Sequence, residues 1–320
     1  MSIGLLAMVG VSPERVAALT AAGYAVREGK KYPDRMDAVR EASDGVRAVL
    51  TNGRGGLSAA EMTLLPKLEI IQAVGAGYEA VDLNEARRRG IAVTNCPDTN
   101  APAVADSAMM LLMAATRHVR EADRFVHGGG WQDQWRIDTP TISGKRLGVV
   151  GMGKIGGRIA HRGARGFDME VGYHNRKAVA DSPYRYFASV VELATWADFL
   201  VCAAPGGAGT RHLVNAEVLA ALGPKGYVVN VGRGTVVDTE ALIDALRSKR
   251  IGGAGLDVLE GEPAVPPRLP ELLQFGNVVI TPHVAGRAPE SRTAATALIL
   301  ENLNAFFAGK PLLSPVLPRA

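Results

Sequence analysis

The sequence predicts an α/β protein of two domains, each built around a parallel β-sheet that helices cover. Short apolar segments alternate with helical segments along most of the chain, which is typical of parallel strands joined by crossover helices. The 320 residues correspond to two domains of ordinary size. A glycine-rich segment, Gly151–Gly156, directly follows one apolar segment and indicates a ligand-binding turn between a strand and a helix.

The composition indicates a globular protein and excludes several other classes of protein and partner. Hydrophobic residues make up 47% of the chain and charged residues 21%, as in a globular protein, and no apolar segment reaches the length of a bilayer span. The segment Met1–Gly10 lacks the basic start and cleavage site of a signal peptide. Cys96 and Cys202 have no metal-ligand spacing and are expected to be buried free thiols of a cytoplasmic protein, so no metal is expected. The net charge is +4, but basic residues are scattered and the densest group, Arg87–Arg89, ends a predicted helix, so neither nucleic acid nor a membrane is expected as a partner.

The first hundred residues are predicted to alternate between strands and helices. The predicted strands are Ile3–Val9, Ala25–Arg27, Ala48–Thr51, Ile70–Val74 and Ala92–Asn95. The predicted helices are Pro13–Ala22, Ala59–Leu65 and Leu83–Arg89. A complete sheet domain is therefore expected to precede the glycine-rich segment.

A long helix is predicted over Ala101–His127. It is apolar on more than one face, so it either lies in the core or is covered by a second subunit, and the sequence leaves both open. Gly128–Gly130 then ends it before a loop that carries Trp131 and Trp135.

The middle of the chain is predicted to form a second, doubly wound sheet of six strands, and a last helix is expected over Glu290–Phe307. Six strands are the complement of a full dinucleotide-binding domain. The predicted strands are Arg146–Val150, Met169–Tyr173, Phe199–Ala203, Tyr227–Val231, Gly255–Val258 and Val278–Thr281.

The glycine-rich segment has the spacing of a dinucleotide-binding turn. Gly151 is expected to make a tight turn, Gly153 to let the backbone approach a pyrophosphate, and Gly156 to let the following helix pack closely on the strand. The N-terminus of that helix, expected over Gly157–Arg165, would offer N–H groups to the anion.

The end of the second strand of this sheet bears on the choice of cofactor. An NAD enzyme of this type usually has an acidic residue about 20 positions after the glycine motif. His174 lies 18 positions after Gly156 and is followed by Asn175, Arg176 and Lys177. Bases in place of the acid favour NADP(H) over NAD(H), because they would bind a 2′-phosphate. The alternative is that both bases are merely solvated loop charges.

Three polar residues follow three strands of the second sheet. Arg233 comes after Val228–Gly232, Glu262 after the strand that ends at Val258, and His283 after the last strand. Because ligands bind beyond the carboxyl ends of parallel strands, these side chains indicate an acid–base pair with an anion anchor. Singly, each could be an ordinary turn residue.

Several motifs in the expected order resemble those of the D-isomer-specific 2-hydroxyacid dehydrogenase family, closest to its NADPH-dependent glyoxylate/hydroxypyruvate reductase branch. The resemblance extends over nearly the whole chain. The motifs are Val74–Tyr78, Val104–Asp106, Gly151–Gly156, Asn230–Gly234, Gly255–Val258, Gly261–Pro263 and Thr281–His283.

The resemblance implies roles for these residues and a domain arrangement. His283 would donate a proton to the substrate carbonyl, Glu262 would orient the imidazole, and Arg233 would bind the 2-oxo acid. A doubly wound Rossmann cofactor domain, residues 100–286, would be inserted into a flavodoxin-like substrate domain, residues 1–99 and 287–320. Substrate contacts besides Arg233 are expected from Ala76, Gly77 and Asn100. Cofactor contacts are expected from Val104, Gly151, Gly153, Lys154, Ile155, Gly156, Asn175, Arg176, Lys177, Pro205, Val231, Gly232, Asp257 and Gly286.

The expected function is reduction of glyoxylate and hydroxypyruvate to D-2-hydroxy acids with NADPH, by a homodimer. The resemblance leaves open whether Trp131 or Trp135 reaches the substrate. Two alternatives stay open: a reductase of another 2-oxo acid (phenylpyruvate, 2-ketogluconate or pyruvate), and a nucleotide-sensing, corepressor-like binding protein on the same fold.

Overall fold

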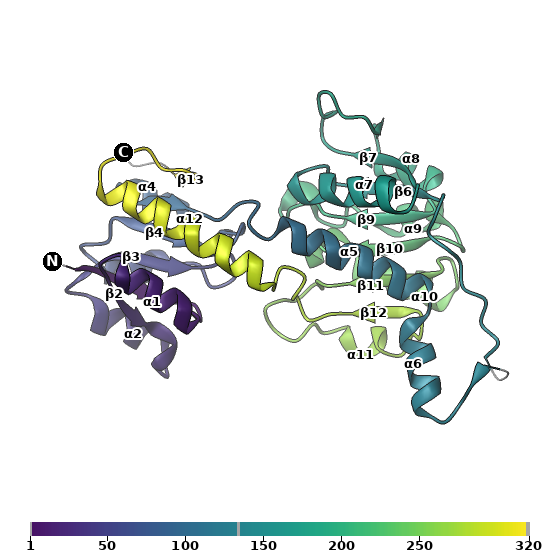
Figure 1. Ribbon diagram of the computed structural model, residues 1–320, viewed down its shortest axis with the longest axis horizontal. Helices are drawn as coiled ribbons and strands as arrows, with labels where there is room; N and C mark the ends of the chain where they lie inside the picture. Colours follow the sequence, from purple (N-terminus) through teal and green to yellow (C-terminus); the bar gives the residue numbers. More distant parts are fainter. Residues whose placement is uncertain (1, 133–134, 318–320) are drawn as a thin grey trace. The chain divides into compact units, whose positions relative to one another are not determined.

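The computed structural model describes residues 2–132 and 135–317. The chain divides into two compact units, Met1–Asn100 with Ala288–Ala320, which is unit 1, and Ala101–Arg287, which is unit 2 (Figure 1). Each unit is an α/β body with its own sheet, as the sequence predicts.

Unit 1 contains a six-stranded sheet in the order β13-β5-β4-β3-β1-β2. All five predicted strands are present and pair in parallel, and the unpredicted β13 pairs antiparallel to β5 at the edge. An edge position is where a strand that begins with proline can be tolerated. The strands are β1 (Ile3–Ala7), β2 (Tyr24–Glu28), β3 (Val46–Thr51), β4 (Ile70–Ala73), β5 (Ala92–Thr94) and β13 (Pro315–Leu317).

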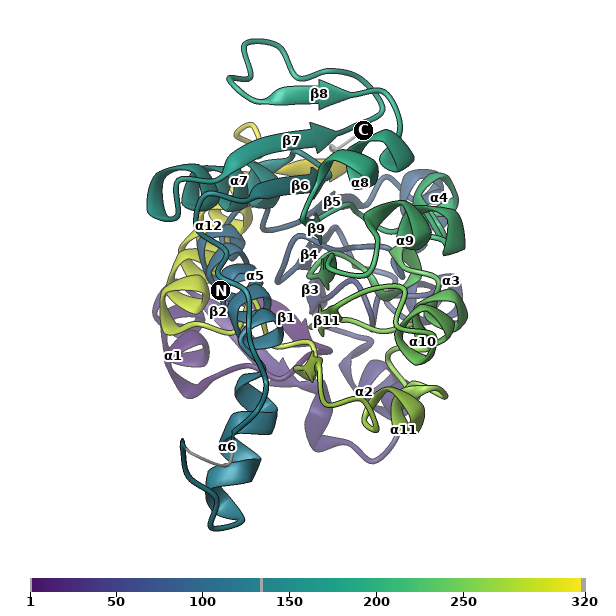
Figure 2. The same cartoon turned by 90° about the vertical axis from the view of Figure 1, so that its right-hand side faces the viewer.

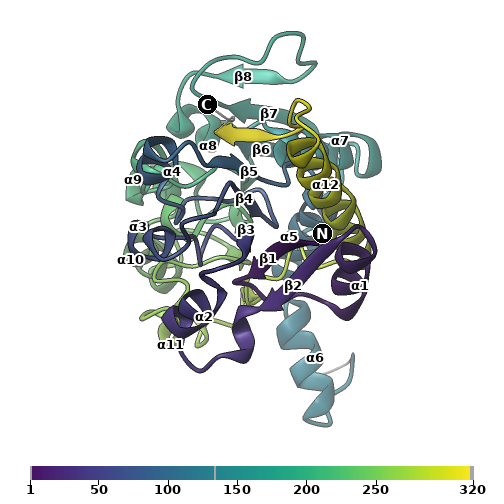
Figure 3. The ribbon, with the colours of Figure 1, turned by 90° about the vertical axis from the view of Figure 1, so that its left-hand side faces the viewer.

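Helices cover both faces of the unit 1 sheet (Figure 3). One core joins α1 and α12 to the sheet through Leu19, Ile299 and Leu303, and the other joins α2, α3 and α4 through Val39 and Met62. The sequence did not predict α2, whose start is capped by the Asp34 side chain accepting from the Met36 N–H at 2.6 Å. The helices are α1 (Pro13–Ala21), α2 (Arg35–Ala42), α3 (Ala59–Thr63), α4 (Leu83–Arg88) and α12 (Pro289–Phe307), with a 3₁₀ turn η1 (Gly29–Lys31).

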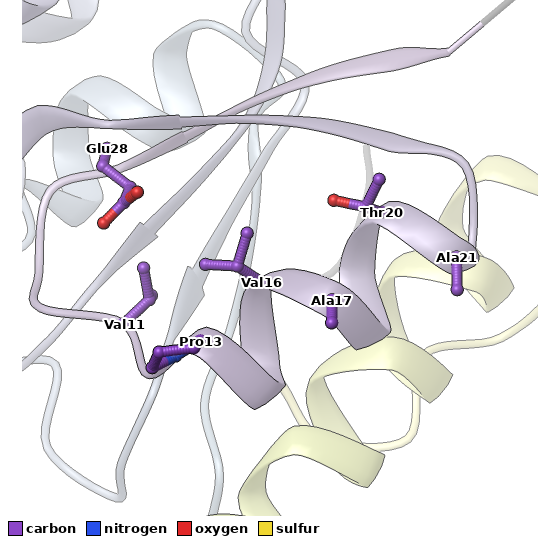
Figure 4. A pocket seen from close by; sticks show the side chains of 7 residues that line it. All are labelled: Val11, Pro13, Val16, Ala17, Thr20, Ala21 and Glu28. Atoms are coloured by element: carbon purple, nitrogen blue, oxygen red, sulfur yellow. The ribbon is translucent and has the colours of Figure 1, made fainter.

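A mainly apolar hollow lies beside α1 in unit 1 (Figure 4). Its one charged lining residue, Glu28, pairs with Lys31 at 2.8 Å. The hollow contains no residue that the sequence assigns to substrate or cofactor. Its lining is Val11, Pro13, Val16, Ala17, Thr20, Ala21 and Glu28.

Unit 2 contains a fully parallel sheet in the order β12-β11-β10-β9-β6-β7-β8. The chain starts at the central β6, runs outward through β7 and β8, and then crosses to β9 and outward again, which is the doubly wound Rossmann order. All six predicted strands are present, and β8 adds a seventh at the edge. The strands are β6 (Arg146–Val150), β7 (Glu170–His174), β8 (Arg185–Phe187), β9 (Phe199–Cys202), β10 (Tyr227–Asn230), β11 (Gly253–Leu256) and β12 (Val278–Ile280).

The unit 2 sheet is also covered on both faces (Figure 2). A core on one face holds α5 and α7 through Leu112 and Ile159, and the core on the other face holds α8, α9 and α10. No helix in the described part of the chain combines the length and apolarity that a bilayer span requires. The helices are α5 (Ala101–Thr116), α6 (Val119–His127), α7 (Lys154–Gly166), α8 (Val190–Trp196), α9 (Ala216–Leu222), α10 (Thr239–Arg247) and α11 (Leu269–Leu272), with 3₁₀ turns η3 (Ala208–Thr210) and η4 (Gly234–Val236).

The prediction of one helix over Ala101–His127 is wrong, because the helix breaks between α5 and α6. His118 takes a left-handed backbone conformation, φ 50°, and its ring pairs with Glu121 in the first turn of α6. The Thr116 hydroxyl donates back to the Leu112 carbonyl at 2.8 Å as α5 ends. Hydrophobic periodicity could not detect this break, since apolar residues continue across it. Much of α5 is buried in the unit 2 core, whereas α6 buries none of its residues and projects from the rest of unit 2 (Figure 2).

Candidate active site

The glycine-rich turn joins β6 to α7 at the carboxyl edge of the unit 2 sheet. Gly151 has φ +96°, which favours glycine, and a Cβ there would lie 2.7 Å from the Ala204 nitrogen. A Cβ on Gly156 would lie 2.0 Å from the Gly151 carbonyl oxygen, so the helix can approach the turn only without a side chain. A Cβ on Gly153 would meet nothing within 4 Å. The turn thus has one glycine facing open space at the N-terminus of α7, which suits the pyrophosphate of a dinucleotide.

The glycine-rich turn before α7 contacts the loop that follows β7. Lys154 and Ile155 begin α7 directly after Gly153. The Asn175 side chain accepts from the Met152 N–H at 2.8 Å, so it ties the end of β7 to the glycine turn. Arg176 and Lys177 follow and are exposed. The end of β7 is therefore followed by two basic side chains. None of the four residues His174, Asn175, Arg176 and Lys177 is acidic.

Arg233 follows β10 in a loop that neighbouring glycines allow to pack tightly. Its backbone carbonyl accepts from the Asn230 side chain at 2.9 Å, and one guanidinium nitrogen donates to the Gly232 carbonyl at 3.0 Å. A Cβ on Gly206 would lie 3.0 Å from the Arg233 side chain. The Arg233 side chain is partly exposed, so its guanidinium can reach an anion in solvent.

Glu262 and His283 form a hydrogen-bonded pair. Oε2 of Glu262 pairs with Nδ1 of His283, while Oε1 of Glu262 accepts from the Leu259 N–H at 2.8 Å. The side chain of His283 is 29% exposed and that of Glu262 is 20% exposed. With Nδ1 engaged by the carboxylate, Nε2 is the ring atom that can exchange a proton with a bound molecule.

Asp257 holds the turn that carries His283. Its carboxylate accepts from the Thr281 hydroxyl at 2.6 Å and from the N–H groups of Val284 and Ala285 at 2.9 and 3.1 Å. Its backbone carbonyl accepts from the His283 N–H at 2.8 Å. Only 2% of Asp257 is exposed. Asp257 therefore holds the turn around His283, which has φ 53°, by three hydrogen bonds to its carboxylate and one to its backbone carbonyl.

The other residues expected around a cofactor lie in unit 2 as well. Val104 is buried in the first turns of α5, and Val231 and Gly232 are buried directly after β10. A Cβ on Gly232 would lie 2.4 Å from the Ala204 carbonyl oxygen, so the loops after β9 and β10 touch at this glycine. Pro205 is exposed after β9, and Gly286 follows the His283 turn.

The expected substrate contacts other than Arg233 belong to unit 1. Ala76 and Gly77 lie in the loop that follows β4, where the Asn95 side chain donates to the Ala76 carbonyl at 2.7 Å. Asn100 lies in the turn at the end of the unit 1 segment Met1–Asn100. The structure therefore brings Glu262 and His283 into contact and places Ala76, Gly77 and Asn100 in the other unit.

Sequence reasoning missed two features near Arg233. Asn230 accepts from the Gly232 N–H at 3.1 Å as well as donating to Arg233, and a polar residue that ends an apolar strand was the available signal. His212, Asp238 and Glu260 form a cluster whose members come from three separate loops. Nothing in their local sequence spacing predicts this contact.

The match to a protein family covers more than half of the chain. Residues 109–285 match the D-isomer specific 2-hydroxyacid dehydrogenase, NAD binding domain. The chain belongs to the D-isomer-specific 2-hydroxyacid dehydrogenase family. The doubly wound sheet, the glycine turn and the Glu262–His283 pair all lie in the part of this dehydrogenase that is its NAD-binding domain.

Relatives of this dehydrogenase act on more than one 2-oxo acid. It is 43% identical to a hydroxyphenylpyruvate reductase of Plectranthus scutellarioides, over 89% of this chain and 90% of the relative. It is 41% identical to a glyoxylate/hydroxypyruvate reductase of Arabidopsis thaliana, over the same shares of both chains. An NADPH-dependent glyoxylate/hydroxypyruvate reductase of Sinorhizobium meliloti, solved with NADP and malonate, superposes with a TM-score of 0.87 at 35% identity, over 100% of this chain and 99% of that one.

Proposed function

We propose that this dehydrogenase reduces glyoxylate and hydroxypyruvate to D-2-hydroxy acids, with NADPH as the preferred reductant. The observation that carries the proposal is the Glu262–His283 pair, which follows β11 and β12 next to the Arg233 loop after β10. A bound nicotinamide dinucleotide supplies a hydride to the carbonyl carbon of the substrate. What remains for the chain is to bind the acid, protonate the carbonyl oxygen and exclude water.

His283 is the proton donor in this proposal. Its Nε2 gives a proton to the carbonyl oxygen as the C–H bond forms, so the oxygen becomes the hydroxyl of the product and the ring is left neutral. Glu262 accepts a hydrogen bond from the Nδ1–H, which stays on the ring, and so fixes the ring direction and its tautomer after the transfer. Both residues are partly exposed, which gives bulk water a route to return the proton.

Arg233 binds the substrate carboxylate and polarises the carbonyl through its planar guanidinium. Unit 1 is the substrate-binding domain in this proposal, with Ala76, Gly77 and Asn100 as further substrate contacts, and unit 2 is the dinucleotide-binding domain. The cofactor contacts proposed in unit 2 are Val104, Gly151, Gly153, Lys154, Ile155, Gly156, Asn175, Arg176, Lys177, Pro205, Val231, Gly232, Asp257 and Gly286.

The preference for NADPH is assigned to the two exposed bases after β7. Arg176 and Lys177 can pair with a 2′-phosphate, and the relative from S. meliloti that was solved with NADP supports this choice. Replacing both bases by glutamine is expected to lower kcat/KM for NADPH by about tenfold or more, because charge-assisted contacts contribute about 1.5–3 kcal/mol each. The same variant is expected to keep kcat/KM for NADH within twofold of the wild-type value. A matched control replaces Lys225, a basic residue in the turn after α9, by glutamine. An unchanged NADPH-to-NADH ratio in the double variant would refute the assignment.

The substrate is tested by following NADPH oxidation with a panel of 2-oxo acids. We expect glyoxylate and hydroxypyruvate to give the highest kcat/KM. Because one relative is a hydroxyphenylpyruvate reductase, the panel includes hydroxyphenylpyruvate and phenylpyruvate, with pyruvate and 2-ketogluconate. A higher kcat/KM for an aromatic acid would overturn the assignment of a small substrate, and turnover of none of the acids would overturn the reductase itself.

The proposed assembly is a homodimer in which α6 and the following loop contact the partner. This region exposes large apolar side chains: Val126 is 49% exposed and Trp131 is 67% exposed. An apolar hollow in the same region is lined by Ala122, Phe125, Val126, Trp131, Gln132 and Trp135. Light scattering is expected to give twice the monomer mass of 33.7 kDa, and a Val126→Glu, Trp131→Glu variant is expected to be monomeric.

The two cysteines fit a cytoplasmic protein, which is the compartment we propose. Cys96 and Cys202 are free and buried, and burial raises the pKa of each thiol to about 12. Thiols of this kind are inert in a reducing compartment.

A further inference from the structure

The loop that follows β4 in unit 1 contains two consecutive peptide groups whose carbonyls are bound by a single segment. The Gly75 carbonyl accepts from the Cys96 N–H at 2.9 Å. The Ala76 carbonyl accepts from Nδ2 of Asn95 at 2.7 Å. Both donors therefore belong to the two residues directly after β5.

These carbonyl contacts fix the direction of two N–H groups. Both peptides are trans, and in a trans peptide the N–H points opposite to the carbonyl. Because the Gly75 carbonyl faces Cys96, the N–H of Ala76 points away from the segment after β5. Because the Ala76 carbonyl faces Asn95, the N–H of Gly77 points away from the same segment. The chain bends here, whereas in an extended strand successive N–H groups would alternate in direction.

The arrangement of the two N–H groups suits a carboxylate. Ala76 is exposed and Gly77 is half-buried, and within the described part of unit 1 neither N–H donates to a backbone carbonyl. A Cβ on Gly53 would lie 2.9 Å from the Gly77 Cα, so the loop after β3 packs directly on Gly77. Adjacent backbone N–H groups that point to one side form a concavity that binds anions.

Asn95 is itself anchored, through Ser314, to a buried asparagine of α12. The Asn95 carbonyl accepts from the Ser314 hydroxyl at 2.6 Å, and that hydroxyl accepts from Nδ2 of Asn302 at 2.8 Å. Oδ1 of Asn302 accepts from the N–H groups of Leu313 and Ser314 at 3.1 and 3.2 Å. Asn302 is 0% exposed, so this anchor is part of the unit 1 core.

The contact of Asn95 with the Ala76 carbonyl sets a direction, which hydration would not do. Ala76 is exposed, so water could hydrogen-bond to the same carbonyl. Water would leave the peptide free to rotate, whereas an anchored amide holds it in one orientation. Only the nitrogen of the Asn95 amide can donate to a carbonyl, so the orientation of the amide is fixed as well.

We propose that Asn95 is a positioning residue that orients the Gly77 N–H toward the carboxylate of the substrate. The inference rests on the proposed function, in which Ala76 and Gly77 contact the substrate. It adds a residue that does not touch the substrate but decides whether the loop after β4 can bind it.

The test variant is Asn95→Leu. Leucine has the branched shape of asparagine but no N–H donor, so the peptide between Ala76 and Gly77 is free to rotate. The substrate carboxylate does not react, so its contacts are equally strong before and during the reaction. We therefore expect KM for glyoxylate to rise by about tenfold, as for the loss of one charge-assisted hydrogen bond. The values of kcat and of KM for NADPH are expected to stay within twofold.

Two further variants separate positioning from a loss of folded protein. Asn95→Ala removes the same donor without adding an apolar group and is expected to give the same rise in KM. Asn84→Leu, at an exposed asparagine on α4 in the same unit, is the matched control and is expected to keep the wild-type KM. A structural role alone would lower kcat, because less of the enzyme is active, and would leave KM unchanged. That result, or a wild-type KM in both Asn95 variants, would overturn the proposal.

The peptide is observed directly by NMR, with alanine labelled at its carbonyl carbon and glycine at its nitrogen. Only alanine–glycine peptides then give a correlated signal, and the sequence contains six of them. The signal of Ala76 and Gly77 is identified by its loss in Ala76→Ser. We expect Asn95→Leu to shift the Ala76 carbonyl resonance, because the carbonyl loses its donor. An unshifted resonance would overturn the proposal.

Oxalate distinguishes a failure of this inference from a failure of the proposed function. Oxalate carries carboxylates and cannot be reduced, so it can be titrated into the enzyme with NADPH bound. We expect it to shift the Gly77 N–H resonances of the wild type, and to need about tenfold higher concentration in Asn95→Leu. No shift in the wild type would remove the loop after β4 as a substrate contact, and with it that part of the proposed function. A shift in both proteins at equal oxalate concentrations would overturn the positioning role alone.

Discussion

The two units share an architecture, a mainly parallel sheet with helices on both faces, but they use their charged side chains differently. In unit 2, Arg233 and the Glu262–His283 pair stand partly exposed beyond neighbouring strands. In unit 1, the Arg35–Glu61 pair binds groups of its own fold: Arg35 donates to the Gly56 carbonyl at 2.7 Å, and Glu61 accepts from Ser58 at 2.8 Å. The charged pair of unit 2 therefore stands where a bound molecule could reach it, whereas the Arg35–Glu61 pair of unit 1 holds loops of its own fold, and the loops make this difference.

Among the variants, His283→Ala should lower activity the most. An unchanged kcat would contradict the contrast between the two units. Removal of a general acid typically lowers the rate by about 10²–10⁴-fold. We expect kcat for glyoxylate to fall by that amount, while NADPH binding, measured by fluorescence titration, stays within a few-fold, because the glycine turn is untouched. Wild-type turnover in His283→Ala would place the chemistry elsewhere in the molecule.

The fold was more predictable from the sequence than the contacts within the site. Strands such as Arg146–Val150 are mostly apolar segments, and the order of alternation indicates a parallel sheet, so eleven strands could be predicted from the sequence. The two edge strands, β8 and β13, are only three residues long and depend on pairing with β7 and β5. Their formation is a tertiary effect that local sequence does not report.

The residues of the candidate site and those around it divide in the same way. Arg233, Glu262 and His283 could be found because each follows a predictable strand in a recognisable motif. The contact of His212 with Asp238 and Glu260 could not, because it joins residues 26 and 48 positions away from His212 through irregular loops. The break at His118 was missed for a related reason, since a single left-handed residue leaves no mark in the hydrophobic pattern.

The two later glycines of the turn separate fold from ligand binding within unit 2. Gly156→Ala is expected to lower the free energy of unfolding by about 1–3 kcal/mol, because its Cβ would lie 2.0 Å from the rigid Gly151 carbonyl oxygen. Gly153→Ala should leave stability nearly unchanged, because that Cβ meets nothing, but weaken NADPH if the pyrophosphate occupies this space. Thermal melting and NADPH titration of both variants test this. Equal melting temperatures, or wild-type affinity in Gly153→Ala, would contradict the division of roles.

Among the variants, Glu61→Gln should have the smallest effect. It tests the contrast between the two units with a carboxylate of unit 1. Burial alone would raise the pKa of Glu61, but hydrogen bonds from Arg35 and Ser58 outweigh it, so its pKa lies below the ordinary value. A lowered pKa in the folded state stabilises the protein above the unfolded-state pKa of about 4.3, and this stabilisation is lost as pH falls through the folded-state value. At neutral pH we expect Glu61→Gln to lower the stability of unit 1 by about 1–2 kcal/mol, measured by hydrogen exchange of the β3 and β4 amides. The difference from wild type should shrink on acidification.

The exposed Arg47–Glu69 pair in the same unit provides the control for this prediction. Its atoms lie 2.8 Å apart, but the side chains are 43% and 37% exposed, so Glu69→Gln should change stability by less than about 1 kcal/mol. Neither variant should alter kcat, because neither carboxylate belongs to the proposed site in unit 2. If Glu61→Gln lowered kcat at unchanged stability, unit 1 would contribute to the chemistry, and the contrast between the two units would have to be abandoned.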